Sequence, residues 1–250
     1  MDVDVVLVEK LVRQAIEEVK NKNLLNLDKF ESVKNYGIFG TMDAAVEASF
    51  VAQKQLLNAS MTDKQKYVDT IKATILKKEN LELISRMSVE ETEIGKYEHK
   101  LIKNRVAAEK TPGIEDLTTE AMTGDNGLTL VEYCPFGVIG AITPTTNPTE
   151  TIICNSISMI AGGNTVVFSP HPRAKNVSIK LVTMLNKALE EAGAPDNLIA
   201  TVKEPSIENT NIMMEHPKIR MLVATGGPAI VNKVMSTGKK AIGAVSYTHL

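Results

Sequence analysis

The sequence predicts an α/β protein built on a doubly wound parallel sheet, and three observations support this prediction. First, the stretch 137–148 (GVIGAITPTTNP) places an apolar run of strand length before a Pro/Thr/Asn turn, and an apolar-periodic segment begins directly after it. Second, strand-like segments alternate with helical segments that are long enough to be crossovers. Third, the 250 residues are 43% hydrophobic, which is enough to bury a sizeable core.

The expected elements follow one another with short turns. The first strand covers the apolar run from Val138 to Ile142, and the helix after it covers 148–161. The remaining strands and helices are expected, in alternation, at 164–169, 174–192, 198–202, 206–215, 219–224, 228–237 and 240–244. Together these elements form a Rossmann-like part over 136–244.

The residues around position 148 are typical of a helix N-terminus. Asn147 occupies the N-cap position, Pro148 the first helical position, and Glu150 stands where a capping box places its carboxylate. Two roles for the Asn147 side chain stay open. It can cap its own helix, or its amide can donate to an oxyanion formed on a substrate carbonyl.

The amino-terminal half is expected to be mostly helical. An amphipathic helix over residues 3–20, within a segment 1–20, is followed by a linker over 21–36, and a short helix on such a tether suits docking into a partner's groove. The further elements expected before residue 137 are helices at 41–58, 62–88 and 90–110 and a half-buried strand at 128–133. The charges of the 90–110 helix are interpreted as a solvated face.

Composition excludes several classes of partner and location. A net charge of -2 and a pI near 6.1 provide no basic field for nucleic acid. No apolar run approaches the roughly 18 residues of a membrane span, and the acidic start of the chain does not match a secretion signal. Two cysteines in a chain of this size fit a reducing cytoplasm. We therefore expect a cytoplasmic protein with a small-molecule partner.

Strand-to-helix turns along one edge of the predicted sheet hold the candidate binding residues, although the nucleotide motifs GxGxxG and GxxxxGK[ST] are absent. The turn SPHPRAK carries Ser169, His171 and Arg173 at or just before a helix N-terminus, where free backbone N–H groups and cationic side chains favour a phosphate. The residue types are equally consistent with a solvated basic turn that binds no phosphate. In the turn 225–228 two glycines either let the backbone approach a ligand closely or form a tight turn.

Other chemistry-bearing residues are weak candidates. Cys154 lies inside the 148–161 helix among isoleucines and is interpreted as a buried small hydrophobe. Cys134 precedes a proline at a strand end and is a weak candidate nucleophile. No metal-ligand spacing is present, so no metal is expected.

Taken together, the motifs resemble those of the CoA-acylating aldehyde dehydrogenases, the branch of the aldehyde dehydrogenase superfamily that converts an aldehyde, NAD and coenzyme A into acyl-CoA and NADH. The resemblance rests on the segments KNRVAAEKTPGIEDL (103–117), GDNGLTLVEYCPFGVIGAITPTTNPTETIICNSI (124–157), SPHPRAK (169–175), ATGGP (224–228) and GKKAIGA (238–244). The segment GDNGLTLVEY is most similar to microcompartment-associated and clostridial members. The resemblance implies a nucleotide-binding domain over 37–244, with a helical part over 41–117.

This resemblance implies two cofactors, NAD and coenzyme A, and roles for individual residues. Asn147 matches the family asparagine that donates to the thiohemiacetal oxyanion. The implied cofactor-binding residues are Thr145 and Thr146 near the nicotinamide, Ser169, His171 and Arg173 at the adenosine phosphates, and Thr225, Gly226 and Gly227 in the pyrophosphate turn. Full-length members use a small aldehyde and associate as homo-oligomers through strands such as 128–133. The 3–20 helix is similar to encapsulation peptides, which predicts a shell-protein partner inside a bacterial microcompartment.

The chain departs from the family pattern after Ala244. In the family this segment continues into a glycine-rich turn and a catalytic domain with the nucleophilic cysteine, whereas residues 245–250 (VSYTHL) match nothing in it. Neither Cys134 nor Cys154 aligns with that nucleophile. We therefore expect an N-terminal fragment that lacks the catalytic domain and is inactive by itself. Two alternatives stay open: part of a bifunctional aldehyde-alcohol dehydrogenase, and a non-catalytic nucleotide-binding or shell-docking module.

Overall fold

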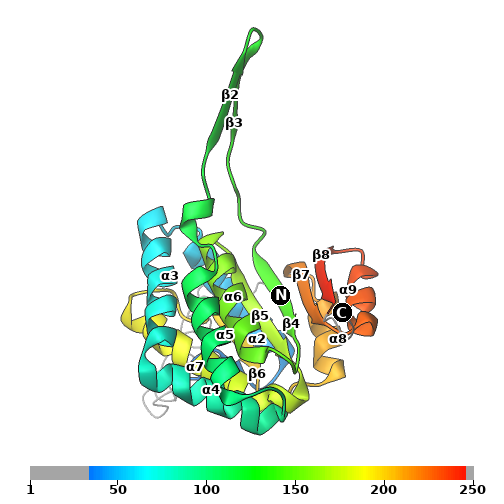
Figure 1. Cartoon of the computed structure of the whole chain (residues 1–250). Coiled ribbons are helices and arrows are strands. Elements are labelled where there is room, and N and C mark those ends of the chain that lie inside the picture. Colours follow the sequence, from blue (N-terminus) through cyan, green and yellow to red (C-terminus); the bar gives the residue numbers. More distant parts are fainter. Residues whose placement is uncertain (1–33, 246–250) are drawn as a thin grey trace, which may run out of the picture. The chain divides into compact units, whose positions relative to one another are not determined.

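A parallel sheet with the strand order β1-β6-β5-β4-β7-β8 forms the centre of the fold (Figure 1). The computed structural model describes residues 34–245, and those from Tyr36 onward belong to one compact unit. The strands of this sheet are β1 (Ile38–Phe39), β4 (Val138–Thr143), β5 (Thr165–Pro170), β6 (Ile199–Val202), β7 (Ile219–Gly226) and β8 (Lys240–Val245). The predicted 3–20 helix, most of the linker over 21–36 and the tail beyond 245 lie outside the described residues.

The path of the chain through the sheet reverses at β4. From β4 the chain proceeds through β5 to β6 on one side, and it then crosses to β7 and β8 on the other side. All neighbouring strands of this sheet are parallel. The predicted doubly wound fold is therefore confirmed. The short edge strand β1, which pairs Ile38 with Thr201 of β6, was not predicted.

Helices cover both faces of the sheet, because a parallel sheet must be buried on both sides. The helices are α2 (Met42–Leu56), α3 (Met61–Leu76), α4 (Lys78–Thr92), α5 (Tyr97–Lys110), α6 (Pro148–Ala161), α7 (Lys175–Glu191), α8 (Ile207–Glu215) and α9 (Pro228–Met235), with single 3₁₀ turns at Ile114–Asp116 and Pro172–Ala174. One apolar core joins the sheet mainly to α3 through α7, and Ile152 and Phe168 lie in it. The second core joins the opposite face to α2, α8 and α9 through residues such as Met42 and Val231.

Two helix boundaries differ from the prediction. The helix expected over 62–88 is divided at Lys77, whose ψ of 128° is not helical, and the Asn80 side chain donates to the Thr74 carbonyl at 2.8 Å across the break. The helix expected over 90–110 begins only at Tyr97. Before it, α4 ends with Glu93 in the left-handed conformation at φ 57°, and Gly95 follows at φ 87°.

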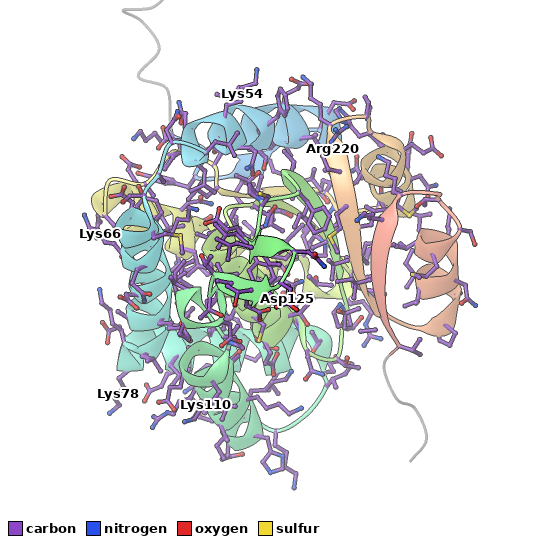
Figure 2. The ribbon with its side chains drawn as sticks, turned by 90° about the horizontal axis from the view of Figure 1, so that it is seen from above. Lys54, Lys66, Lys78, Lys110, Asp125 and Arg220 are labelled. Carbon is purple, nitrogen blue, oxygen red and sulfur yellow. The ribbon has the colours of Figure 1, made fainter. Side chains whose placement is uncertain are left out.

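An antiparallel hairpin of β2 (Glu120–Gly124) and β3 (Gly127–Val131) extends away from the sheet, with Asp125 in its turn (Figures 1 and 2). The strand expected at 128–133 is present in shorter form, but the prediction that it is half-buried was wrong. Every residue of β2 and β3 is exposed. Alternation within the strand was a misleading signal, because nothing in the described part of the chain covers either face.

Gln53 of α2 ties that helix to the entry of β5. Its side chain is buried, its Nε2 donates to the Gly163 carbonyl at 2.8 Å, and its Oε1 accepts from the Thr165 N–H at 2.7 Å. We expect Gln53→Leu to lower the free energy of unfolding by roughly 2–4 kcal/mol, since each unsatisfied buried group costs about 1–3 kcal/mol. Urea unfolding measures this loss. The matched control is Gln55→Leu on the exposed face of α2, and an equal loss in both variants would contradict the prediction.

Candidate functional site

The carboxyl ends of β5, β4 and β7 lie side by side at one edge of the sheet. The register pairs Thr143 with Pro170 across β4 and β5, and Ile142 with Ala224 across β4 and β7. The turns that follow these strands therefore share this edge, next to the reversal of the strand order. Ligands of open α/β sheets bind at such a reversal, outside the carboxyl ends of the strands.

Asn147 stands at the N-cap position of α6, but its side chain makes no cap bond, so the capping role left open from the sequence is wrong. Its Oδ1 instead accepts from the Lys103 ammonium of α5 at 3.1 Å. An ammonium only donates, so it must face the amide oxygen. The amide nitrogen of Asn147 is thereby left available to donate to a ligand.

Glu150 does not close a capping box, because its carboxylate pairs with a buried lysine. The Lys100 ammonium lies 3.1 Å from Glu150 Oε1 and 2.7 Å from the carbonyl oxygen of Thr146, and the Lys100 side chain is only 2% exposed. The Thr149 hydroxyl also donates to Glu150 at 3.0 Å. Burial lowers the pKa of Lys100, and the Glu150 carboxylate opposes this shift. The ion pair joins α5 to the β4–α6 turn.

Sequence reasoning missed Lys100, because the charges of its helix were interpreted as a solvated face. A signal was present in the spacing of the small residues. Asn104, Ala107 and Ala108 are buried together with Lys100, at the three- and four-residue intervals of one helix face. A lysine on the same helix face as such small residues is a candidate for burial beside a carboxylate.

A groove of about 530 Å³ runs beside Asn147, between α5 and α6. Residues that line it include Ile102, Lys103, Val106, Asn147, Cys154 and Thr225. The structure thus brings together two of the predicted site residues, Asn147 and Thr225, from different turns. The predicted residues Thr145, which is half-buried, and Thr146, which is exposed, precede Asn147 in the same turn.

Directly after the 169–175 turn, two backbone N–H groups at the start of α7 that were expected to be free are already occupied. The carboxylate of Glu91, at the end of α4, accepts from the N–H groups of Asn176 and Val177 at 2.7 Å each. The Arg173 guanidinium donates to the Thr92 carbonyl at 3.1 Å. A carboxylate from the protein itself therefore takes the place expected for a phosphate at the start of α7.

Ser169 and His171 are also less available than the sequence suggested. Ser169 is buried, and its hydroxyl lies 2.8 Å from that of Thr210 in α8. His171 Nδ1 accepts from the Arg173 N–H at 3.1 Å. Burial, together with the charge of Arg173, lowers the pKa of His171 and so disfavours the cationic imidazolium that would attract a phosphate.

Gly226 and Gly227 connect β7 to α9, and neither has a positive φ. The backbone conformation therefore does not require glycine at either position, as a tight turn with a positive φ would. A Cβ on Gly226 would lie 2.8 Å from the Ile230 side chain, whereas a Cβ on Gly227 would meet nothing within 4 Å. The α9 N-terminus also has no side-chain cap. This turn thus offers an open approach to backbone donors.

Cys154 is half-buried, because it packs against the apolar core and also lines the groove, so its interpretation as a buried small hydrophobe was only partly right. The Thr111 hydroxyl donates to its sulfur at 3.1 Å, and burial raises the pKa of the thiol. Cys134 is exposed. Within residues 34–245 no cluster of three or more His, Cys, Asp or Glu side chains could hold a metal ion. No helix of this part is long and apolar enough to cross a membrane.

The doubly wound parallel sheet, with an open glycine turn at the reversal of its strand order, places the chain in the class of open α/β folds that bind ligands at the carboxyl ends of their strands. Residues 35–248 match the aldehyde dehydrogenase family. The chain belongs to this family.

Three similar proteins indicate the branch of the aldehyde dehydrogenase family that this chain resembles. A propanal dehydrogenase (CoA-propanoylating) of Citrobacter freundii is 47% identical over 212 residues, which are 85% of this chain and 46% of the relative. The crystal structure of Rhodopseudomonas palustris propionaldehyde dehydrogenase with bound propionyl-CoA has a TM-score of 0.83 and 69% identity, over 84% of this chain and 47% of that one. An engineered glycolyl-CoA reductase with bound NADP+ has a TM-score of 0.83 and 67% identity, over 84% and 48%.

These relatives confirm the resemblance to CoA-acylating aldehyde dehydrogenases that the motifs indicated. The chain spans about half the length of the curated relatives it matches, 46% and 50% in two of them.

The two thiols should differ in reactivity. The thiolate is the reactive form, and burial raises the pKa of Cys154 despite the opposing effect of the hydrogen bond from Thr111. We expect iodoacetamide to modify exposed Cys134 at least about tenfold faster than Cys154. Mass spectrometry of the labelled peptides measures both rates, and the fast phase should disappear in Cys134→Ser. Equal rates would contradict the assignment.

Glu91 should stabilise α7 by capping its N-terminus. We expect Glu91→Ala to lower the free energy of unfolding by about 1–2 kcal/mol, because two backbone N–H groups lose a charged acceptor. Chemical denaturation measures the change. The neighbouring exposed Glu90, replaced by alanine, serves as the control, and its loss should stay within about 0.5 kcal/mol.

Proposed function

We propose that this chain is the amino-terminal, nucleotide-binding part of a CoA-acylating aldehyde dehydrogenase. The reaction converts a small aldehyde, NAD and CoA into acyl-CoA and NADH. The observation that carries the proposal is the state of Asn147, whose amide oxygen is held by Lys103 while its nitrogen stays free beside the groove. The CoA-propanoylating relative and the propionyl-CoA-bound structure support the same reaction.

In the proposed reaction, a cysteine thiolate adds to the aldehyde carbonyl, and the Asn147 amide donates to the oxygen that becomes negative. NAD accepts the hydride and CoA accepts the acyl group. The positive end of α6 also favours negative charge beside Asn147. Asn147 therefore acts on the charge that develops during the reaction.

The nicotinamide cofactor is assigned to the edge formed by the β4 and β7 turns. Gly227 leaves open space for a pyrophosphate to approach the backbone, and the uncapped start of α9 offers N–H donors. Thr145 and Thr146 are assigned to the nicotinamide end. In the 169–175 turn, contact of a phosphate with the start of α7 requires displacement of Glu91.

The reactive thiolate is assigned to a part of the enzyme outside these 250 residues. Burial raises the pKa of Cys154, and this effect outweighs the opposing hydrogen bond that its sulfur accepts from Thr111. Cys134 is exposed and does not line the groove. Neither residue has the environment of an activated nucleophile. Homo-oligomer formation, docking of the 3–20 helix to a shell protein and a microcompartment location stay predictions.

The 250-residue chain tests both parts of the proposal. Mixed with propionaldehyde, NAD and CoA, it should form no NADH, whereas calorimetry should detect NAD binding. Gly227→Val should weaken that binding by roughly tenfold or more, because the side chain occupies the open approach. The matched control is Gly40→Val, at another open and exposed glycine. NADH formation would refute the inactivity of the chain, and absence of NAD binding would refute the nucleotide-binding assignment.

A further inference from the structure

Two lysines of α5 hold the turn that carries Asn147. Lys100 donates to the main-chain oxygen of Thr146 at 2.7 Å, and Lys103 donates to the side-chain oxygen of Asn147 at 3.1 Å. The three-residue spacing places both lysines on the same side of α5. One helix therefore fixes both the backbone before Asn147 and the Asn147 side chain.

We propose that Lys103 is a positioning residue for oxyanion stabilisation, which it performs by holding the Asn147 amide with its nitrogen directed at the reacting carbonyl. The inference rests on the proposed function, because it assigns Lys103 a part in the same reaction. Lys103 does not touch the substrate in this proposal. It acts through Asn147.

Hydrogen-bond chemistry fixes which way the amide faces. A lysine ammonium has three donors and no acceptor, whereas an asparagine amide has an acceptor oxygen and a donor nitrogen. Turning the Asn147 amide over would place donors against donors. Asn147 makes no cap bond to its own helix, so in the described structure the contact with Lys103 is what selects its orientation.

The charge of Lys103 also makes Asn147 a better donor. A cation at the amide oxygen polarises the group and increases the positive charge on its N–H protons, because hydrogen bonds in a chain strengthen one another. Lys103 and Asn147 line the same groove. Orientation and polarisation therefore act at the place where the carbonyl oxygen becomes negative.

Lys103 can be tested without damage to the fold, in contrast to Lys100. Replacing Lys100 would leave the Glu150 carboxylate buried without its cation, so a loss of activity in that variant would reflect a loss of folding stability. Lys103 is exposed. The matched control is Lys110, which lies exposed at the end of the same helix (Figure 2).

The kinetic test is a double-mutant cycle in the enzyme that carries this chain. We expect Lys103→Met to lower kcat about 10- to 100-fold with KM for NAD and CoA changed less than about twofold. Lys103→Arg, which keeps a donor, should restore most of the rate, and Lys110→Met should leave it unchanged. In the Asn147→Ala background, Lys103→Met should cause no further loss. Equal losses in both backgrounds would overturn the inference.

A second measurement on the 250-residue chain separates this inference from the proposed function. The side-chain amide resonances of ¹⁵N-labelled Asn147, assigned by their loss in Asn147→Ala, should shift in Lys103→Met and not in Lys110→Met. Unchanged resonances would overturn the positioning role whatever the enzyme catalyses. If the resonances shift but the enzyme does not catalyse CoA-dependent aldehyde oxidation, the proposed function is refuted. The conclusion that Lys103 orients Asn147 then still holds.

Discussion

β4 is buried along its whole length and paired with parallel strands on both sides, and this position constrains the rest of the fold. Parallel neighbours can be reached only by crossover connections, so the chain must pass over one face toward β5 and β6 and over the other toward β7 and β8. Two apolar cores follow from these two paths. Because the strands all run in one direction, turns from distant parts of the sequence meet at one edge.

The buried pair of Lys100 and Glu150 links the helical region to this edge. Loss of one partner from such a pair costs about 3–5 kcal/mol, because the other charge stays in a poorly solvated site. The contact with the Thr146 carbonyl extends the same restraint to the main chain. Asn147 therefore lies in a turn that α5 holds in place, and not in a mobile loop. A group that stabilises a developing charge must be held in position in this way.

Local sequence signals were sufficient for five strands of the parallel sheet, β4 to β8, and for the start of α6, but not for the short edge strand β1. The apolar run before Asn147 and the proline after it specify a strand, a turn and a helix start through neighbouring residues alone. The contacts of Lys100, Lys103 and Glu91 could not be predicted in this way. Their partners lie far along the sequence, and helical periodicity indicates only which face of a helix is buried. The break at Lys77 likewise depends on a side-chain bond that has no strong sequence signature.

The exposed hairpin of β2 and β3 affects how this chain behaves in concentrated solution. Leu128 and Leu130 are 62% and 61% exposed, and within the described part of the chain no further strand pairs with either outer edge. Unpaired edges of this kind can accept a strand from another molecule. This short ribbon outside the folded core is therefore an edge at which copies of the chain can associate, and we expect a charged residue in place of either leucine to oppose that association while the sheet and the groove stay intact.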